Sequence, residues 1–574
     1  MLESIVALLE GSRAFLLSLL PISFTISLLF TSIFFLLNFH RMREYFKIRR
    51  YTWVILTLIF LLAISLRALT PVYLTTYTDE FSHIEVGKWI AFYGKAGMCE
   101  EFPDSREVSC WLFNEPVGFS YIISLFFLVL GVSEASAYAV NLVMGSLLAV
   151  IVFLLCFLLF KNERAGLYSA FILSILPLYI LLSRNIEPDT VSAFFIILTF
   201  LGFLLFSKIR DFKTGMFAMG ILAFSVSIKQ ENVLLIPLVL LLMFLFVDLK
   251  EVRCALKNKK SWFLFVLFVI LATPHILHLS LELYPAFFYG KSTATAVGGQ
   301  LIKVENIGMN AEILNRAMDG SFYPLLINLF VVIGVLHVLR KKRREGVFLV
   351  IFFLSYMFVY LSYSATIVEK YLITGLLPLI CFAGVGMYAT EEFVTTRFRN
   401  LIRWKTINFA VPLILVVGLL LLSLPYFYEI RENPKPLNVN HGYPRTEIHY
   451  KEMETIRMMD REIDSCYVIT EEPIFFSATD LKPIKTESVL MNPETLKEEG
   501  GKCIFYFEDL YCTNFYSLGD RCGIENESFE RCEEFRQKIV SRCREMHEEY
   551  QLKPYLKYEW GNFTFTVYNI SLGP

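Results

Sequence analysis

Long uninterrupted hydrophobic runs alternate with short polar connections along most of this chain. Most runs have a length near the roughly 20 residues that an α-helix needs to cross the hydrocarbon core of a bilayer, and some are shorter. The pattern predicts twelve membrane spans, so we expect a polytopic α-helical membrane protein. The spans cover residues 14–38, 52–70, 137–160, 165–183, 190–207, 214–228, 232–248, 262–280, 322–339, 347–364, 371–389 and 408–427.

Lys and Arg gather in every second connection. Basic residues follow the first, third, fifth, seventh, ninth and eleventh spans, and Arg340–Arg344 is an unbroken basic run. Because positively charged connections stay in the cytoplasm, both termini are expected on the extracytoplasmic side. The apolar segment Val117–Leu130 is short for a span and would invert the charge bias if it crossed. We expect it to lie along the outer interface.

The chain becomes more polar after the last span. Residues 428–574 predict a small extracytoplasmic α/β domain, with three N-x-S/T sequons at Asn526, Asn562 and Asn569. Its expected elements are helices over 445–463 and 528–550, strands over 466–470 and 503–507, and a hairpin of 555–560 and 563–568. The expected domains are 1–51 (an extra span and a basic loop), 52–427 (a transmembrane domain with outer loop 71–136) and 428–574.

Composition adds two constraints. The chain is 55% hydrophobic and 19% charged, and its net charge of -1 argues against a nucleic-acid partner. Eight of its 11 cysteines lie in the two polar regions expected outside the cytoplasm. Even numbers there predict disulfides, with free thiols or a metal site as the alternative. These cysteines are Cys99, Cys110, Cys466, Cys503, Cys512, Cys522, Cys532 and Cys543.

Several polar clusters come from separate loops on the predicted outer face. They are Asp79–His83, Arg184–Asp189 and Val368–Tyr371, with Lys229 as a further single cation. Charges this near a bilayer are costly unless they face water or a site. A carboxylate can take a proton from an attacking hydroxyl or amine, and cations can neutralise a phosphate leaving group. The alternative for each single cation is that it only snorkels to water.

Four motifs in this order carry a family resemblance. Tyr77–His83, Asn114–Pro116, Ser183–Asp189 and Lys370–Leu372 resemble the GT-C membrane glycosyltransferases, in particular the aminoarabinose transferases and the protein O-mannosyltransferase-like group. The resemblance covers about residues 52–390. It implies a lipid-phosphate-linked sugar donor, an acceptor that the sequence does not identify, transfer outside the cytoplasm, and inversion at the sugar carbon.

The resemblance also implies roles for individual residues. Asp79 would be the catalytic base or its equivalent, supported by Glu80, and Asp189 would be the second acidic residue of the site. The candidate contacts to the donor phosphate or substrate are Arg184, Lys229, Lys370, Tyr371, Glu115 and His83.

A divalent metal is a possible cofactor, because an acidic residue and a histidine hold a metal in some relatives. The candidate ligands are Glu115, His275 and His278, with the two histidines three residues apart. One departure is Asn141, which stands where the family often has an arginine.

Two other functions remain open at this stage. A lipid or sugar transporter or flippase would show internal repeats and ionisable residues in mid-span, and we find neither convincing repeats nor many such residues. A structural or assembly factor would leave Asp79-Glu80 unexplained. An oligosaccharyltransferase catalytic subunit is disfavoured, because those carry a Trp-Trp-Asp-type motif and this chain has no Trp-Trp pair.

Overall fold

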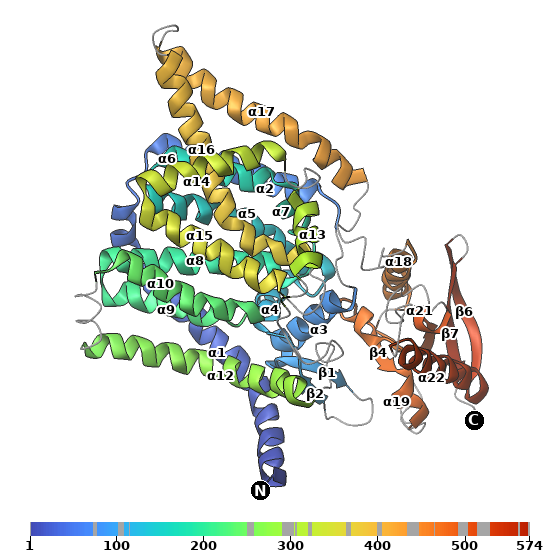
Figure 1. The fold of residues 1–574 in the computed structure, drawn as a ribbon. Coiled ribbons are helices and arrows are strands. Elements are labelled where there is room, and N and C mark those ends of the chain that lie inside the picture. Colours follow the sequence, from blue (N-terminus) through green and yellow to red (C-terminus); the bar gives the residue numbers. More distant parts are fainter. Residues whose placement is uncertain are drawn as a thin grey trace. The chain divides into compact units, whose positions relative to one another are not determined.

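The fold was analysed in a computed structural model, which is mainly helical (Figure 1). It describes residues 2–72, 77–101, 108–113, 115–248, 258–289, 304, 307–318, 324–362, 369–398, 404–432, 447–463, 465–491, 503–513, 528–560 and 563–571. Within these ranges some side chains, including that of Asp79, are outside the described part.

Eight of the described helices are long and apolar enough to cross a membrane. They overlap the first, second, third, fifth, eighth, tenth, eleventh and twelfth predicted spans, which confirms a multi-pass helical membrane protein. They are α1 (Leu2–Tyr45), α2 (Arg50–Leu69), α5 (Glu134–Phe160), α8 (Pro188–Ile209), α12 (Lys259–Tyr289), α15 (Arg343–Leu361), α16 (Leu372–Phe398) and α17 (Trp404–Glu432).

The other four predicted spans form shorter helices. The segment 165–183 is split into α6 (Glu163–Ile175) and α7 (Pro177–Leu181), because Pro177 disfavours helical backbone at the residue before it. The remaining three are α9 (Phe212–Ser225), α10 (Leu235–Phe246) after the 3₁₀ turn η1 (Gln230–Leu234), and α14 (Leu325–Lys341). The predicted interfacial segment is helix α4 (Gly118–Leu130), and α13 covers Ile307–Met318.

Close helix packing depends on small residues, as is common in membrane proteins. A Cβ added to Gly334 of α14 would lie 1.8 Å from the carbonyl oxygen of Phe382 in α16. A Cβ on Gly386 of α16 would lie 1.9 Å from the carbonyl oxygen of Phe330 in α14. Glycine at these two positions lets the backbones of α14 and α16 come into contact.

The chain divides into two compact units. Unit 1 consists of Met1–Tyr73, Leu112–Ile122 and Tyr138–Leu437, and unit 2 consists of Leu74–Trp111, Ile123–Ala137 and Asn438–Pro574. Unit 2 begins with helix α3 (Tyr77–Tyr93), and the strands β1 (Gly97–Glu101) and β2 (Val108–Leu112) pair with each other.

The C-terminal part of unit 2 is the predicted α/β domain, built on one five-stranded sheet in the order β4-β3-β5-β7-β6. Strand β3 is parallel to β4 and β5, and β7 is antiparallel to β5 and β6. The elements are α18 (Glu447–Glu462), β3 (Tyr467–Thr470), η4 (Pro473–Phe476), β4 (Lys482–Lys485), α19 (Thr486–Met491), β5 (Ile504–Glu508), α21 (Leu510–Thr513), α22 (Ser528–Glu549), β6 (Gln551–Trp560) and β7 (Phe563–Ser571). Strands β1, β2 and β4 were not predicted.

Three disulfides confirm the prediction from the cysteine distribution. Cys99–Cys110 joins β1 to β2, Cys466–Cys503 joins the residues before β3 and β5, and Cys512–Cys543 joins α21 to α22. The second of these closes the amino ends of two parallel strands. Cys522 and the side chain of Cys532 lie outside the described residues.

Candidate functional site

Charged side chains from three separate loops gather at helix ends in unit 1. We call them the loop-end cluster, and it consists of Glu187, Asp189, Lys229, Glu231 and Lys370. The Lys229 ammonium lies 2.6 Å from Asp189 Oδ1 and also contacts Glu231, and Lys370 Nζ lies 3.0 Å from Glu187 Oε2. Lys229 and Lys370 are 9% and 7% exposed, so these are buried ion pairs.

The loop before α8 is held in place by hydrogen bonds. Asn141 of α5 is buried, and its amide nitrogen donates to the carbonyl oxygens of Asn185 and Glu187, both at 2.8 Å. Pro188 opens α8, a position where its missing N–H has no cost. Asn141 therefore holds the backbone of the loop that carries Glu187 and Asp189. From the sequence, Asn141 was noted only as a departure from the arginine that the family often has at this position.

A second anchor for this loop is Arg67, in the last turn of α2, which the sequence analysis did not single out. Arg67 is fully buried, and its guanidinium donates to Ser183 Oγ at 3.1 Å and to the Ala63 carbonyl oxygen at 3.0 Å. Arg184, a predicted phosphate contact, donates to the Thr70 carbonyl oxygen at 2.9 Å. A lone arginine inside an apolar run is costly and is a signal that sequence reasoning could have used.

Two tyrosines complete the surroundings of Lys229. Its ammonium lies 4.4 Å from the ring centroid of Tyr371, a residue of η3 (Glu369–Tyr371), and 5.9 Å from that of Tyr360. Tyr360 also donates to Glu231 at 3.1 Å. Burial opposes the charge on Lys229, but the carboxylates of Asp189 and Glu231 outweigh it and hold the pKa of Lys229 above its ordinary value. Lys229 is therefore a cation at neutral pH.

The carboxylate of Asp189 is only partly engaged. Its Oδ1 accepts from Lys229, whereas Oδ2 is buried without a hydrogen-bond partner in the described part of the chain. Leaving a buried acceptor unpaired costs free energy, so this oxygen is free to accept a hydrogen bond from a bound group. The structure thus brings together Asp189, Lys229, Lys370 and Tyr371 from the predicted set.

Asp79, Glu80 and His83 lie in unit 2. The prediction of a loop at these positions was wrong, because they belong to α3, where acidic residues in the first turn favour the helix. Glu80 and His83 are fully buried, and the side chain of Asp79 lies outside the described residues.

The candidate metal ligands are not assembled into a metal site. His275 and His278 of α12 are buried with ring centroids 6.4 Å apart, and His278 Nε2 donates to the Phe113 carbonyl oxygen at 2.7 Å. Glu115 is half-buried two residues after Phe113. No group of three His, Cys, Asp or Glu side chains suited to a metal occurs among the residues that the structure describes.

Comparison with known proteins adds a family and a fold. Residues 114–278 match the family described as dolichyl-phosphate-mannose-protein mannosyltransferase. This segment contains Glu115, Arg184, Asp189 and Lys229. No curated protein matches the chain by sequence.

Two solved proteins share the fold. ArnT from Cupriavidus metallidurans, crystallised with undecaprenyl phosphate, is 10% identical with a TM-score of 0.54, and the match covers 91% of this chain and 98% of ArnT. The oligosaccharyltransferase AglB of Archaeoglobus fulgidus, solved with an inhibitory peptide and a dolichol-phosphate, is 12% identical with a TM-score of 0.51. That match covers 82% of this chain and 71% of AglB.

The chain thus shares the helical membrane fold of ArnT and AglB, and its residues 114–278 are similar to the mannosyltransferase family.

Proposed function

We propose that the protein transfers a sugar from a polyprenyl- or dolichyl-phosphate-linked donor to an acceptor on the extracytoplasmic face, with inversion at the sugar carbon. The loop-end cluster carries this proposal. Buried ammonium groups at the ends of membrane helices can hold the phosphate of a lipid whose chain lies between apolar helices. The family match and the lipid phosphates bound by ArnT and AglB support the same donor class.

Lys229 and Lys370 have the properties that a phosphate contact needs. Each is a buried cation whose present partners are side-chain carboxylates. An ammonium is a compact charge on a flexible stem, so it can exchange a carboxylate oxygen for a phosphate oxygen. Arg184, half-buried at the same loop, is the third candidate contact, and Tyr371 would lie beside the bound phosphate because its ring faces Lys229.

The reaction follows from these roles. Asp79 takes the proton of the acceptor hydroxyl or amine as that atom forms a bond to the anomeric carbon. The bond from this carbon to the phosphate oxygen breaks, and the lipid phosphate leaves with the electron pair. The cations of the loop-end cluster stabilise the charge that develops on it. Attack opposite the leaving group inverts the anomeric carbon. Glu80, next to Asp79 on α3, would support the base.

The experiment is sugar transfer and release from a panel of polyprenyl-phosphate sugars by the purified protein, compared with Asp79→Asn. Removing a general base lowers kcat by about 100- to 10,000-fold, and donor binding should change little. Asp480→Asn, at an exposed carboxylate of the C-terminal domain, is the matched control and should retain full turnover. Equal background turnover by all three folded proteins across a broad panel would refute the proposed reaction and favour transport.

A further inference from the structure

A short turn of the C-terminal domain, η4, packs against α3 within unit 2. The rings of Phe475 in η4 and Phe81 in α3 meet edge to face, with centroids 5.6 Å apart and an interplanar angle of 77°. Both side chains are 1% exposed. Edge-to-face aromatic pairs add directional attraction to the apolar area they bury, so this contact fixes an orientation as well as a distance.

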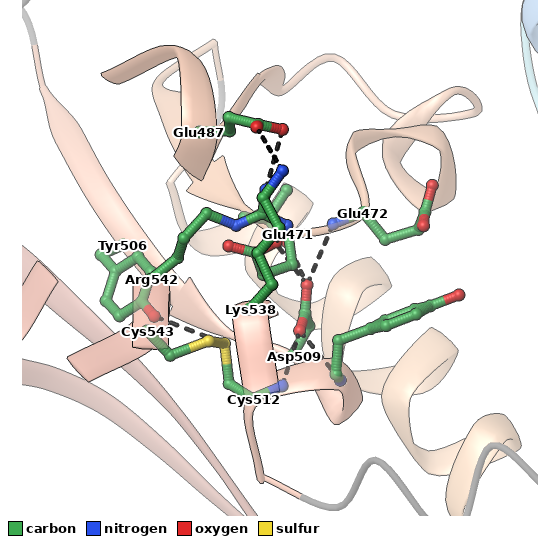
Figure 2. A network of polar contacts seen from close by, with 11 residues as sticks. Glu471, Glu472, Glu487, Tyr506, Asp509, Cys512, Lys538, Arg542 and Cys543 are labelled. Carbon is green, nitrogen blue, oxygen red and sulfur yellow. Dashed lines mark hydrogen bonds and ion pairs between the residues drawn. A yellow bond between two sulfur atoms is a disulfide. The ribbon is translucent and has the colours of Figure 1, made fainter. Parts of the chain in front are cut away.

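The turn itself is firmly attached to the domain. Asp509, at the end of β5, accepts hydrogen bonds from the backbone N–H groups of Glu471 and Glu472 at 2.9 and 3.1 Å (Figure 2). Arg542 of α22 holds the Glu471 carboxylate at 2.6 Å. These are the residues that lead directly into η4. Phe475 therefore extends from a rigid support.

The position of Phe81 relates this contact to the proposed base. Asp79 precedes Phe81 by two residues on α3, and Glu80 is adjacent to it. At 3.6 residues per turn, positions 79 and 83 each lie about 160° around the axis from position 81, so they share the opposite helix face. Phe475 therefore packs on the face of α3 opposite position 79, where its contact with Phe81 helps to fix the rotation of the helix.

We propose that Phe475 is a positioning residue for the transfer reaction, holding α3 in the orientation that presents Asp79 to the acceptor. The proposal rests on the proposed function for the role of Asp79, but the contact it invokes can be measured without turnover. In this proposal the C-terminal domain supports the transfer reaction indirectly. Asp509 and Arg542 hold the turn η4 in place, and Phe475 of this turn packs against Phe81 of α3.

The test uses the adjacent phenylalanine as a matched control. Phe476 is also buried, but its ring packs against Phe507 in the domain's own sheet, with centroids 5.9 Å apart. Phe475→Ala and Phe476→Ala are compared in the full-length protein in detergent or nanodiscs. Two readouts are taken: hydrogen exchange of the α3 backbone amides, and kcat and KM for the donor sugar lipid that wild type uses.

We expect Phe475→Ala to raise amide exchange in α3 and to lower kcat by about 10- to 100-fold, the cost of a misplaced catalytic group. The KM for the donor should stay within about twofold, because the proposed donor contacts lie on other elements. Phe476→Ala should loosen the sheet but leave α3 exchange and kcat near wild type. If Phe475→Ala does not fold, Phe475→Leu, which keeps bulk without the ring, takes its place with the same expected direction.

Unchanged α3 exchange in a folded Phe475 variant would overturn the proposal, whatever the activity. Raised exchange with unchanged kcat would also overturn it, provided that Asp79→Asn is inactive. If Asp79→Asn is itself fully active, Asp79 is not the base, and the positioning role fails with it even where the exchange data confirm the contact.

Discussion

Two buried aspartates in this protein have opposite surroundings. Asp509 of the C-terminal domain is 1% exposed and accepts hydrogen bonds at both carboxylate oxygens, from the Thr470 hydroxyl and from four backbone N–H groups. Asp189 of the loop-end cluster is 2% exposed and receives one hydrogen bond, from the Lys229 ammonium, while its second oxygen has no partner in the described structure.

The cations near these two aspartates also differ in how many fixed partners they have. Arg542 spreads its planar guanidinium over Glu471 and Glu487, at 2.6 and 2.8 Å (Figure 2). Lys229 places a compact ammonium among carboxylates and tyrosine faces. Backbone donors and a bidentate guanidinium fix a fold, because they cannot leave without unfolding it. An ammonium can change partners. The comparison favours a structural role for the first network and supports the proposal that the second holds the donor phosphate.

The largest expected effect is on stability, at Arg542. Arg542→Gln leaves the buried carboxylate of Glu471 without its cation, so we expect a loss of about 3–5 kcal/mol. Thermal unfolding followed by protease protection of the C-terminal domain measures it. Lys538→Gln removes an exposed cation from Glu487 and should cost under about 1 kcal/mol. Equal effects of the two changes would show that burial is not what makes this network structural.

The pH dependence of stability gives the second prediction. Burial raises the pKa of Asp509 to about 6, against hydrogen bonds that favour the carboxylate. Because the folded pKa exceeds the unfolded one, this group's contribution is fully present below about pH 4 and lost as pH rises through 6. Asp509→Asn does not titrate. The stability advantage of wild type over this variant should therefore shrink by up to about 3 kcal/mol between pH 4 and pH 7. A constant difference across that range would contradict it.

A smaller effect is expected at Asn141, which hydrogen-bonds to the loop that carries Glu187. Asn141→Ala removes the amide that orients the backbone of Glu187, so we expect donor-phosphate affinity to fall by about tenfold with a stability loss near 1 kcal/mol. Asn38→Ala, at a buried asparagine of α1, is the matched control and should leave affinity unchanged. Loss of affinity in both variants would indicate general loosening of the membrane helices.

Predictions from the sequence were confirmed for features that the sequence displays directly, such as the length of a hydrophobic run. Hydrophobic length predicted the long spans, and cysteines in expected outer regions predicted the disulfides. It failed for 165–183, where Pro177 divides the helix, and for β4, whose four residues include two lysines and a proline. The pairing of Lys229 with Asp189 joins residues 40 positions apart. No local rule predicts which carboxylate a buried lysine will meet, so the cluster could be proposed from sequence but not assembled.

The most direct test of the central claim is binding of undecaprenyl phosphate and dolichyl phosphate to three purified proteins. These are wild type, the charge-neutral double variant Lys229→Gln/Asp189→Asn, and Arg542→Gln. Replacing both members of the pair avoids leaving Asp189 charged without its cation, while Glu231 keeps its hydrogen bond from Tyr360. We predict that the double variant binds at least about tenfold more weakly than wild type, whereas Arg542→Gln binds normally below its unfolding temperature. Wild-type affinity in the double variant would contradict the assignment of the loop-end cluster as the donor-phosphate site.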